Sequence, residues 1–306
     1  MSYFKCPGAE ARSSEQNPLS IAQVIVPRSR DIGGFEVRRV LPAREQRMVG
    51  PFVFFDQMGL GHFEAGQGLD VRPHPHIGLA TVTYLYSGQI MHRDSLGSRQ
   101  LIRPGAVNWM TAGRGIVHSE RTPEKLRQGN SDLFGLQAWV ALPVDQEESD
   151  PDFSHHPEES LPLIEDGGAS VRVLAGSLYG QNSPVPVRTE TIYADLTLEP
   201  GASVPIDSPH EERALYLAAG TVSIDGQSYA SGQLLVLAPG AALTLRAETA
   251  SRVALLGGEP LDGPRHLWWN FVSSRKERID QAKADWQDGR FDRVVDDPEW
   301  IPLPDH

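Results

Sequence analysis

The chain has 306 residues, a formal net charge of −12, ten histidines and a single cysteine. At roughly 150 residues per domain, this length predicts about two domains, each with enough buried surface for a core. Because its one thiol, Cys6, has no intramolecular partner, the chain is not a disulfide-stapled secreted scaffold. The acidic balance argues against direct nucleic-acid binding, which requires basic surface to displace counterions from phosphates.

The sequence contains no pattern typical of a signal peptide or a membrane helix. Residues 1–13 lack the apolar core of a secretory signal. The most apolar stretch, residues 234–245, is interrupted by Pro239 and Gly240 and is much shorter than the roughly 20 residues that a membrane helix needs. We therefore expect a soluble, cytoplasmic protein without a membrane partner.

Most of the chain is predicted to form short strands. Runs of β-branched, aromatic or leucine residues occupy residues 81–86, 234–237 and 252–256, and a glycine follows each run closely. Such runs at regular turn spacing indicate an all-β sandwich or barrel. The glycine and proline pattern of residues 68–105 recurs in weaker form at residues 201–240, which indicates that one β-domain has been duplicated.

An acidic segment separates the two halves. Residues 144–162 contain seven Asp or Glu and no Lys or Arg. We expect them to form an exposed linker between an N-terminal domain, residues 1–143, and a C-terminal domain, residues 163–306. His155 and His156 lie in this segment, where adjacent side chains of an extended chain point to opposite sides. This arrangement favours a solvated loop over a metal site.

The C-terminal region differs from the rest because it has a helical period. Ser274 and Glu277 have the spacing of a capping box, and Gly289 offers a stop. The apolar residues between them, at helical spacing, are Ile279, Ala282 and Trp286. We expect about four helical turns packed on a sheet. Three prolines in residues 290–306 then predict an extended strap.

Two short segments carry histidines at alternate positions. They are His74-Pro75-His76 and His118-Ser119-Glu120. In an extended chain residues i and i+2 face the same side, so each segment offers two donors on one face. If the two strands face each other, three imidazoles and one carboxylate converge. This donor set suits a divalent transition metal and leaves up to two octahedral positions open for a substrate and O₂.

Each pair of donors also has a simpler explanation. A His-x-His pair alone is more often hydrogen-bonded within the fold, and a His-x-Glu pair is a weaker signal still. Their joint occurrence beside Gly and Pro favours the metal site. The prolines at positions 73 and 75 lack backbone donors, which places this stretch at a strand start or at an edge strand.

Small residues next to the first histidine pair predict a cavity. Gly78 and Ala80 follow His74 and His76 on the same face and are too small to fill a barrel interior. Ligand sites are mostly apolar with a few polar anchors. Residues that either line this cavity or form ordinary barrel core are Phe52, Phe54, Phe55, Met58, Trp109 and Met110.

At these segments the sequence resembles the pirin family of the cupin superfamily. The spacing of Gly68, the His74 to His76 pair and Gly88 resembles the first cupin motif. Further pirin-like segments are residues 50–52, 92–97, 109–120 and 269–272. The resemblance implies an all-β bicupin, with two tandem jelly-roll-like barrels and one iron in the N-terminal barrel.

By residue matching, the resemblance places the pirin metal ligands on His74, His76, His118 and Glu120. It implies one divalent transition metal per chain, with Fe(II) expected and Mn, Ni, Co, Cu and Zn as alternatives. Pirins commonly follow His-Pro-His with Arg-Gly-Phe-Glu, whereas Ala80 here stands where the acid would be. Glu120 must therefore supply the carboxylate.

The C-terminal barrel departs from the metal pattern. Counting back from Gly220 places Ile206 and Ser208 where histidines would stand, and His210 is out of register. We expect this barrel to be metal-free, with His210 exposed in a loop.

Two functions follow from the resemblance. Some pirins oxidise the flavonol quercetin, which implies a dioxygenase of the quercetin 2,3-dioxygenase type, with a flavonol substrate, O₂, and Glu120 as general base. Vertebrate pirins are nuclear transcription co-regulators, which implies instead a metal- or redox-responsive protein that contacts a protein partner without turnover. His92 is either an outer-shell partner of the metal ligands or a structural hydrogen-bonding residue of an exposed hairpin.

Overall fold

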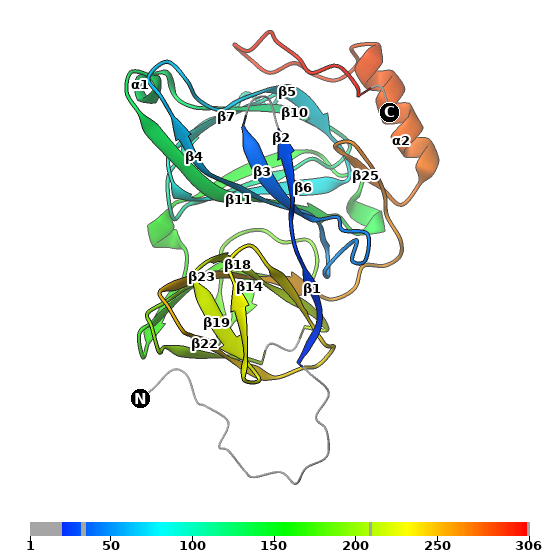
Figure 1. The fold of residues 1–306 in the computed structure, drawn as a ribbon. Coiled ribbons are helices and arrows are strands. Elements are labelled where there is room, and N and C mark those ends of the chain that lie inside the picture. The colour runs from blue at the N-terminus through cyan, green and yellow to red at the C-terminus, as the bar shows by residue number, and fades with distance from the viewer. Residues whose placement is uncertain (1–19, 32–34, 208–209, 305–306) are drawn as a thin grey trace. The chain divides into compact units, whose positions relative to one another are not determined.

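The computed structural model describes residues 20–31, 35–207 and 210–304. Within them, strands predominate, and the two α-helices are α1 (Glu124–Arg127) and α2 (Lys276–Gln287). Figure 1 shows the strands gathered into two bodies. Three of the positions considered above, Cys6, residues 1–13 and Ser208, lie outside the described residues.

The chain divides into two compact units whose bounds differ from the predicted domains. The first, here called the histidine unit, consists of residues 28–160 and 261–306. The second unit consists of residues 161–260 and the described residues up to 27. The N-terminal strand belongs to the second unit because it pairs with the edge of that unit's sheet, at Ile25 and Leu234. Residues 261–306 belong to the histidine unit because their apolar side chains pack there.

The histidine unit contains two antiparallel sheets and a hairpin. The larger sheet has the order β12 (Asp152–His156), β9 (Val107–Thr111), β6 (Leu79–Ser87), β11 (Ser131–Ala141), β4 (Phe52–Phe63), β3 (Glu36–Leu41) and β2 (Arg28–Asp31). The smaller has the order β5 (Asp70–His76), β10 (Ile116–Arg121), β7 (Ile90–Asp94) and β8 (Arg99–Ile102). The hairpin is β24 (His266–Trp268) and β25 (Phe271–Ser273). Buried side chains of both sheets, such as Leu85 and Ile102, form one core cluster.

The second unit repeats this arrangement. Its larger sheet has the order β1 (Ile21–Ile25), β21 (Leu234–Leu237), β18 (Glu212–Ala219), β23 (Ser251–Gly258), β16 (Thr191–Leu198), β14 (Ala169–Leu178) and β13 (Leu163–Asp166), with β15 (Gln181–Asn182) beside β14. Its smaller sheet has the order β17 (Ser203–Ile206), β22 (Leu243–Ala247), β19 (Thr221–Ile224) and β20 (Gln227–Ala230). If the four strands of each smaller sheet are numbered in the order in which they occur along the chain, both sheets have the spatial order first, fourth, second, third. This shared order confirms the predicted all-β class with two related barrels.

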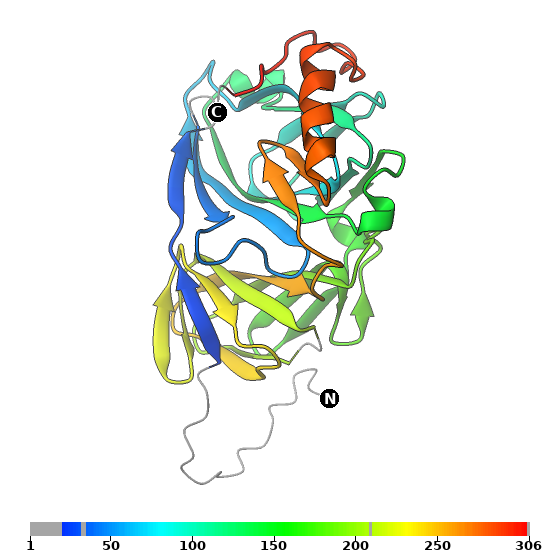
Figure 2. The same ribbon diagram turned by 90° about the vertical axis from the view of Figure 1, so that its right-hand side faces the viewer.

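Helix α2 has the predicted apolar stripe but not the predicted cap. Its buried residues are Ile279, Ala282 and Trp286, and they cluster with Ile77, Val117 and Phe271. The helix itself runs along the outside of the histidine unit (Figure 2). Gly289, with φ of +68°, follows its end. The capping box is wrong, because the cap residue is Arg275 and Ser274 is bonded elsewhere. The backbone N–H of Ser274 donates to Glu147 Oε1 at 2.7 Å.

The acidic segment up to Ser160 is built into the histidine unit and is not a separate linker, although six of its seven acidic residues are exposed as predicted. It forms two short 3₁₀ turns, η1 (Val144–Gln146) and η2 (Glu158–Ser160), and the strand β12, which pairs with β9. Glu147 is only 3% exposed, and its Oε1 lies 2.9 Å from Nε of the buried Arg265. This ion pair compensates the burial of a charge that composition alone predicts to be solvated.

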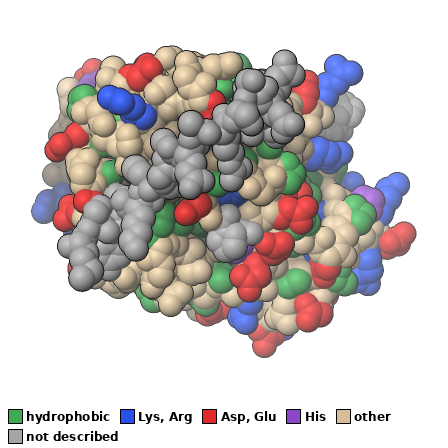
Figure 3. Space-filling model, turned by 90° about the horizontal axis from the view of Figure 1, so that it is seen from below, with side chains coloured by type: hydrophobic (Ala, Val, Ile, Leu, Met, Phe, Trp, Pro, Cys, Tyr) green, Lys and Arg blue, Asp and Glu red, His purple; other side chains and the backbone are tan. Residues whose placement is uncertain are grey.

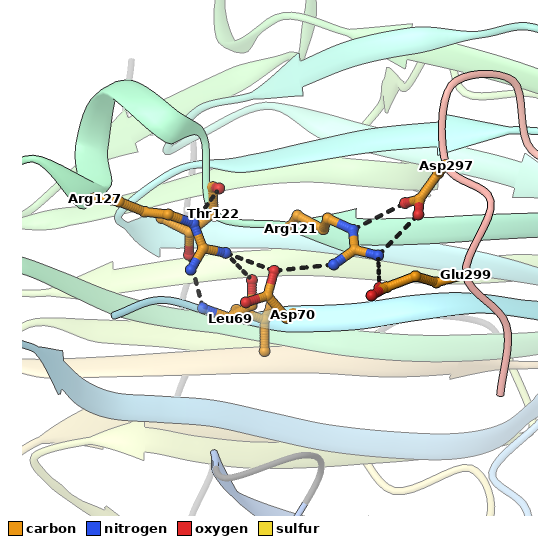
Figure 4. Close-up of polar contacts among 7 residues, drawn as sticks. All are labelled: Leu69, Asp70, Arg121, Thr122, Arg127, Asp297 and Glu299. Atoms are coloured by element: carbon orange, nitrogen blue, oxygen red, sulfur yellow. Dashed lines mark hydrogen bonds and ion pairs between the residues drawn. The ribbon is translucent and has the colours of Figure 1, made fainter. Parts of the chain in front are cut away.

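The C-terminal strap is held by a cluster of charged side chains (Figure 4). Arg121, at the end of β10, lies 2.8 Å from Asp297 Oδ1 and 2.6 Å from Glu299 Oε2. Asp70 bridges Arg121 and Arg127, at 3.2 and 2.6 Å. The strap therefore contacts the strands that carry the histidines, where the N–H of Ile301 also donates to the carbonyl of Pro73 at 2.9 Å.

Acidic side chains, together with Lys and Arg, lie across the face seen in Figure 3, in keeping with the net charge of −12. In the part of the chain that the structure describes, no helix is long and apolar enough to cross a membrane.

Candidate metal centre

Strands β5 and β10 bring the two histidine segments together. They pair antiparallel, with His118 opposite His74 and Ile116 opposite His76. Strand β5 is at the edge of its sheet, as its two prolines predicted, because proline cannot donate to a second neighbour. The pairing shifts register between His118 and Glu120, so Glu120 lies opposite Val71. The two histidine segments therefore lie on adjacent paired strands, as expected from the sequence, with one register shift before Glu120.

Three buried imidazoles form a compact group. His74, His76 and His118 are 7%, 1% and 2% exposed, and one ring nitrogen from each lies within 4.8 Å of the others. The Nε2 atoms of His76 and His118 are 3.1 Å apart. Two nitrogens bound at about 2.1 Å and at right angles to one ion would be about 3 Å apart. The spacing of these two atoms therefore fits two neighbouring ligands of a transition metal.

The hydrogen bond of His74 identifies its free nitrogen. Its Nδ1 atom is 2.8 Å from the carbonyl oxygen of Arg72. A carbonyl can only accept, so Nδ1 carries the proton and donates. The lone pair is left on Nε2, and the ring is oriented by the backbone of its own strand, as is usual for metal-binding histidines.

Burial keeps the three imidazoles neutral. Desolvation lowers the pKa of His74 to about 4 and the pKa values of His76 and His118 well below the ordinary value, and neighbouring imidazoles lower the latter two further. Neutral imidazole is the form that binds metal. Near pH 7 the group therefore offers uncharged nitrogen donors and loses no binding energy to deprotonation.

Glu120 lies beside one member of this group. It forms a second compact group with His118 and His92, and it is 7% exposed. Burial raises the pKa of its carboxyl, whereas His92 and the hydroxyl of Thr83 act in the opposite direction. The Thr83 hydroxyl is 2.9 Å from Glu120 Oε1. The four predicted residues therefore lie on β5 and β10, where His74, His76 and His118 form one group and Glu120 belongs to a second group that shares His118.

His92 is on the hairpin of β7 and β8 but is buried there, so only its predicted exposure is wrong. It is 2% exposed, with its Nε2 atom 3.0 Å from Asp94 Oδ2 and its Nδ1 atom 3.4 Å from His118 Nδ1. Phe153 stacks on it, with the ring centroids 4.3 Å apart. Asp94 was not predicted as a site residue, although its position two residues after His92 in a strand was an available signal.

The cavity expected next to His76 is not supported at Gly78. This residue has φ of +68°, and a Cβ added to it would lie 2.0 Å from the carbonyl oxygen of Val272. The chain bends there and packs against β25, so the alternation of faces ends at His76. Ala80 belongs to β6 in the other sheet.

The six apolar neighbours singled out in the sequence are all buried. One of them reaches the histidines indirectly: Phe54 stacks on Trp139 at a centroid distance of 3.9 Å, and Trp139 meets the His76 ring edge-on at 5.2 Å. Met110 shares the cluster of Phe54 and Trp139, and Met58 belongs to a separate core cluster.

The equivalent place in the second unit is apolar. Val204 pairs with Leu245 and Ile206 with Leu243, in the register that His74 and His76 have on β10. Counting back from Gly220 had assigned Ile206 and Ser208, which are two residues beyond these equivalent positions. The reason is that the segment between β17 and Gly220 is two residues longer than the corresponding segment of the histidine unit. In this unit's described residues, no group of three possible metal ligands occurs.

His210 of the second unit is 7% exposed, so its predicted exposure is wrong. Its Nδ1 atom is 3.8 Å from Glu259 Oε1.

The comparisons with known proteins agree with the fold. The pirin domain family matches residues 34–140, and the pirin C-terminal cupin domain family matches residues 193–292. A pirin-like protein of Caulobacter vibrioides is 52% identical over 283 residues, which is 91% of this chain and 97% of that protein. The crystal structure of a quercetin 2,3-dioxygenase from Acinetobacter baumannii has a TM-score of 0.86 and 37% identity, covering 93% of this chain and 96% of that one. The chain therefore belongs to the pirin family and is a bicupin.

Proposed function

We propose that this pirin is a dioxygenase that cleaves a flavonol such as quercetin with O₂, using one divalent transition metal in the histidine unit. The observation that carries the proposal is the group of three buried, neutral imidazoles, two of whose Nε2 atoms are 3.1 Å apart. The 37% identity to a quercetin 2,3-dioxygenase supports the reaction class.

His74, His76, His118 and Glu120 would hold the metal, with Fe(II) as the expected ion. When bound, the metal would supply Lewis-acid and redox chemistry for the reaction of an electron-rich enol with O₂. In the overall reaction both oxygen atoms enter the organic product and one carbon leaves as carbon monoxide.

The chain's own residues have separate tasks in this proposal. The carbonyl of Arg72 orients His74 through the 2.8 Å hydrogen bond. Glu120 is the general base that takes the proton of the flavonol hydroxyl, because its carboxylate lies beside the imidazoles that would hold the metal. Thr83 orients this carboxyl from 2.9 Å. The burial of all three imidazoles excludes bulk water from the reacting atoms.

The test combines metal analysis with oxygen uptake. Protein loaded anaerobically with Fe(II) should contain about one equivalent of iron per chain. When quercetin and O₂ are added, this protein should consume oxygen and release carbon monoxide. The double variant His74→Ala, His118→Ala should lose both metal and turnover. His62→Ala is the matched control, because His62 is an exposed histidine of the same unit.

Full metal content in the double variant would contradict the site. If loaded wild-type protein consumes no flavonol or catechol-like compound, the dioxygenase proposal fails, and the metal-responsive interaction protein replaces it.

A further inference from the structure

Asp94, His92 and His118 form a chain of buried polar side chains. Asp94 Oδ2 is 3.0 Å from His92 Nε2, and His92 Nδ1 is 3.4 Å from His118 Nδ1. Asp94 is fully buried and His92 is 2% exposed. The three meet because β7 and β10 are paired, with Asp94 opposite His118. The chain therefore runs from a strand end to one of the proposed ligands.

The carboxylate at one end determines the direction of every hydrogen bond in this chain. Asp94 Oδ1 accepts hydrogen bonds from two backbone N–H groups at 2.9 Å, and the ionised carboxylate can only accept, so Oδ2 accepts from His92. His92 then carries its proton on Nε2 and has a lone pair on Nδ1. His118 must donate its Nδ1 proton to that lone pair, which leaves the lone pair of His118 on Nε2.

We propose that Asp94 and His92 are positioning residues that fix the tautomer and ring orientation of His118, so that its Nε2 atom is presented to the metal. The inference rests on the proposed metal site. A carboxylate–imidazole chain behind a ligand sets which ring nitrogen is free and raises the basicity of the ligand.

The surroundings hold Asp94 in place independently of His92. In the turn between β7 and β8, the backbone N–H groups of Leu96 and Ser98 both donate to Asp94 Oδ1 at 2.9 Å. The same turn is tied to β10, where the N–H of Ser95 donates to the carbonyl of Val117 at 2.8 Å. The anchor of the chain is therefore rigid.

The acidic segment also contributes to this arrangement. Phe153, on β12, stacks on the His92 ring with an interplanar angle of 15°. This contact restricts rotation of the ring about the bond that orients Nδ1 toward His118. The segment that composition predicts to be a linker thus supports the metal centre through one aromatic side chain.

The variant Asp94→Asn tests the direction of the chain. Its amide oxygen can keep both hydrogen bonds of the turn, while its amide nitrogen becomes a donor to His92 Nε2. The hydrogen bond between His92 and His118 then reverses, so His92 donates to Nδ1 of His118. The proton of His118 moves to Nε2, where it occupies the lone pair that would bind the metal. The same loss of the correct tautomer follows when the aspartate of a serine-protease triad is replaced by asparagine.

Two measurements follow from this reversal. Long-range ¹H–¹⁵N correlation spectra of metal-free, ¹⁵N-histidine-labelled protein should show His118 protonated at Nδ1 in the wild type and at Nε2 in Asp94→Asn. Titration with Co(II) should show a 10- to 100-fold weaker affinity in the variant, the usual effect of losing an outer-shell partner.

The matched control is Asp132→Asn, since Asp132 forms an exposed carboxylate–imidazole pair with His62 at 2.7 Å in the same unit. It should leave both the His118 tautomer and Co(II) affinity unchanged. If Asp94→Asn does not fold, His92→Phe takes its place, because phenylalanine keeps the stacking on Phe153 and removes both ring nitrogens. That variant should also weaken Co(II) binding by about tenfold or more.

The outcomes separate the two proposals. An unchanged His118 tautomer, or an unchanged Co(II) affinity, in Asp94→Asn or its replacement would overturn the positioning role. A wild-type protein that binds no Co(II) would contradict the metal site, while the spectra of the metal-free protein would still decide the tautomer.

Discussion

The two units share one framework but fill it with different chemistry. In each smaller sheet, the first strand pairs with the fourth in the same register. The histidine unit places His74 and His118 opposite each other there, and the second unit places Val204 and Leu245. Burying aliphatic side chains stabilises a fold by about 1.5 to 3 kcal/mol each, whereas a buried imidazole needs a partner. The comparison indicates that one barrel supplies a binding site and the other supplies stability.

Exchanging equivalent residues between the two units is the most direct test of this difference. His76→Ile gives the histidine unit the residue that stands at position 206, and we expect it to abolish detectable metal binding. Loss of a ligand should exceed the 10- to 100-fold effect of losing an outer-shell partner. Co(II) titration measures the affinity, and circular dichroism checks that the variant is folded. Binding at wild-type affinity would exclude His76 from the site.

The reverse exchange, Ile206→His, should cost stability without creating a site. The variant loses a buried aliphatic side chain and buries an imidazole among apolar neighbours, for a total of about 4 kcal/mol. Urea denaturation of the full chain measures this loss. Val24→His, at a position that is 41% exposed in the same unit, is the control and should be nearly neutral. A stable Ile206→His variant would show that the second barrel tolerates the chemistry of the first.

The pH dependence of stability should distinguish the metal-free wild type from His76→Ile. Because burial lowers the histidine pKa values in the folded state, the unfolded chain binds more protons below about pH 6.5. Stability is therefore highest above that pH and falls as the pH decreases toward the lowered pKa values. Removing one such group should make the slope shallower by about 1.4 kcal/mol per pH unit between pH 6 and 5. If the free energy of unfolding depends on pH with equal slopes in the wild type and in His76→Ile, His76 is not neutral in the folded state.

The strap should give the smallest effect. Arg121→Gln removes the ion pairs to Asp297 and Glu299, and we expect a loss of about 1 kcal/mol and faster hydrogen exchange in residues 288–304. Burial raises the pKa of Asp297, but hydrogen bonds from Arg121 and Ser119 lower it overall. Its contribution is therefore present above the ordinary carboxyl pKa and disappears as the pH falls through the lowered value. Unchanged exchange in the strap would show that the cluster does not hold it.

Much of the site was predictable because it depends on local alternation. Side chains that are two residues apart on one strand lie on the same face of the sheet. This rule selected His74, His76 and His118. A second local pattern, the helical period, predicted the apolar stripe of α2, where Ile279, Ala282 and Trp286 are buried.

What the sequence did not predict depends on contacts between distant segments. Glu147 is buried because Arg265, far along the chain, pairs with it at 2.9 Å. Gly78 lines no cavity because Val272 approaches its backbone. Spacing along the strand could have linked Asp94 to His92, but the link from these two residues to His118 depends on the pairing of β7 with β10. Composition and periodicity contain none of these pairings, which arise when the strands assemble.

The central claim is that the three imidazoles of the histidine unit bind one metal through Nε2. The most direct test is a crystal structure of Fe(II)- or Co(II)-loaded protein with anomalous data collected at the metal edge. We expect one peak, about 2.1 Å from the Nε2 atoms of His74, His76 and His118, with the Glu120 carboxylate as the fourth ligand. A peak elsewhere, coordination through Nδ1, or no peak in protein soaked with the metal would contradict the account.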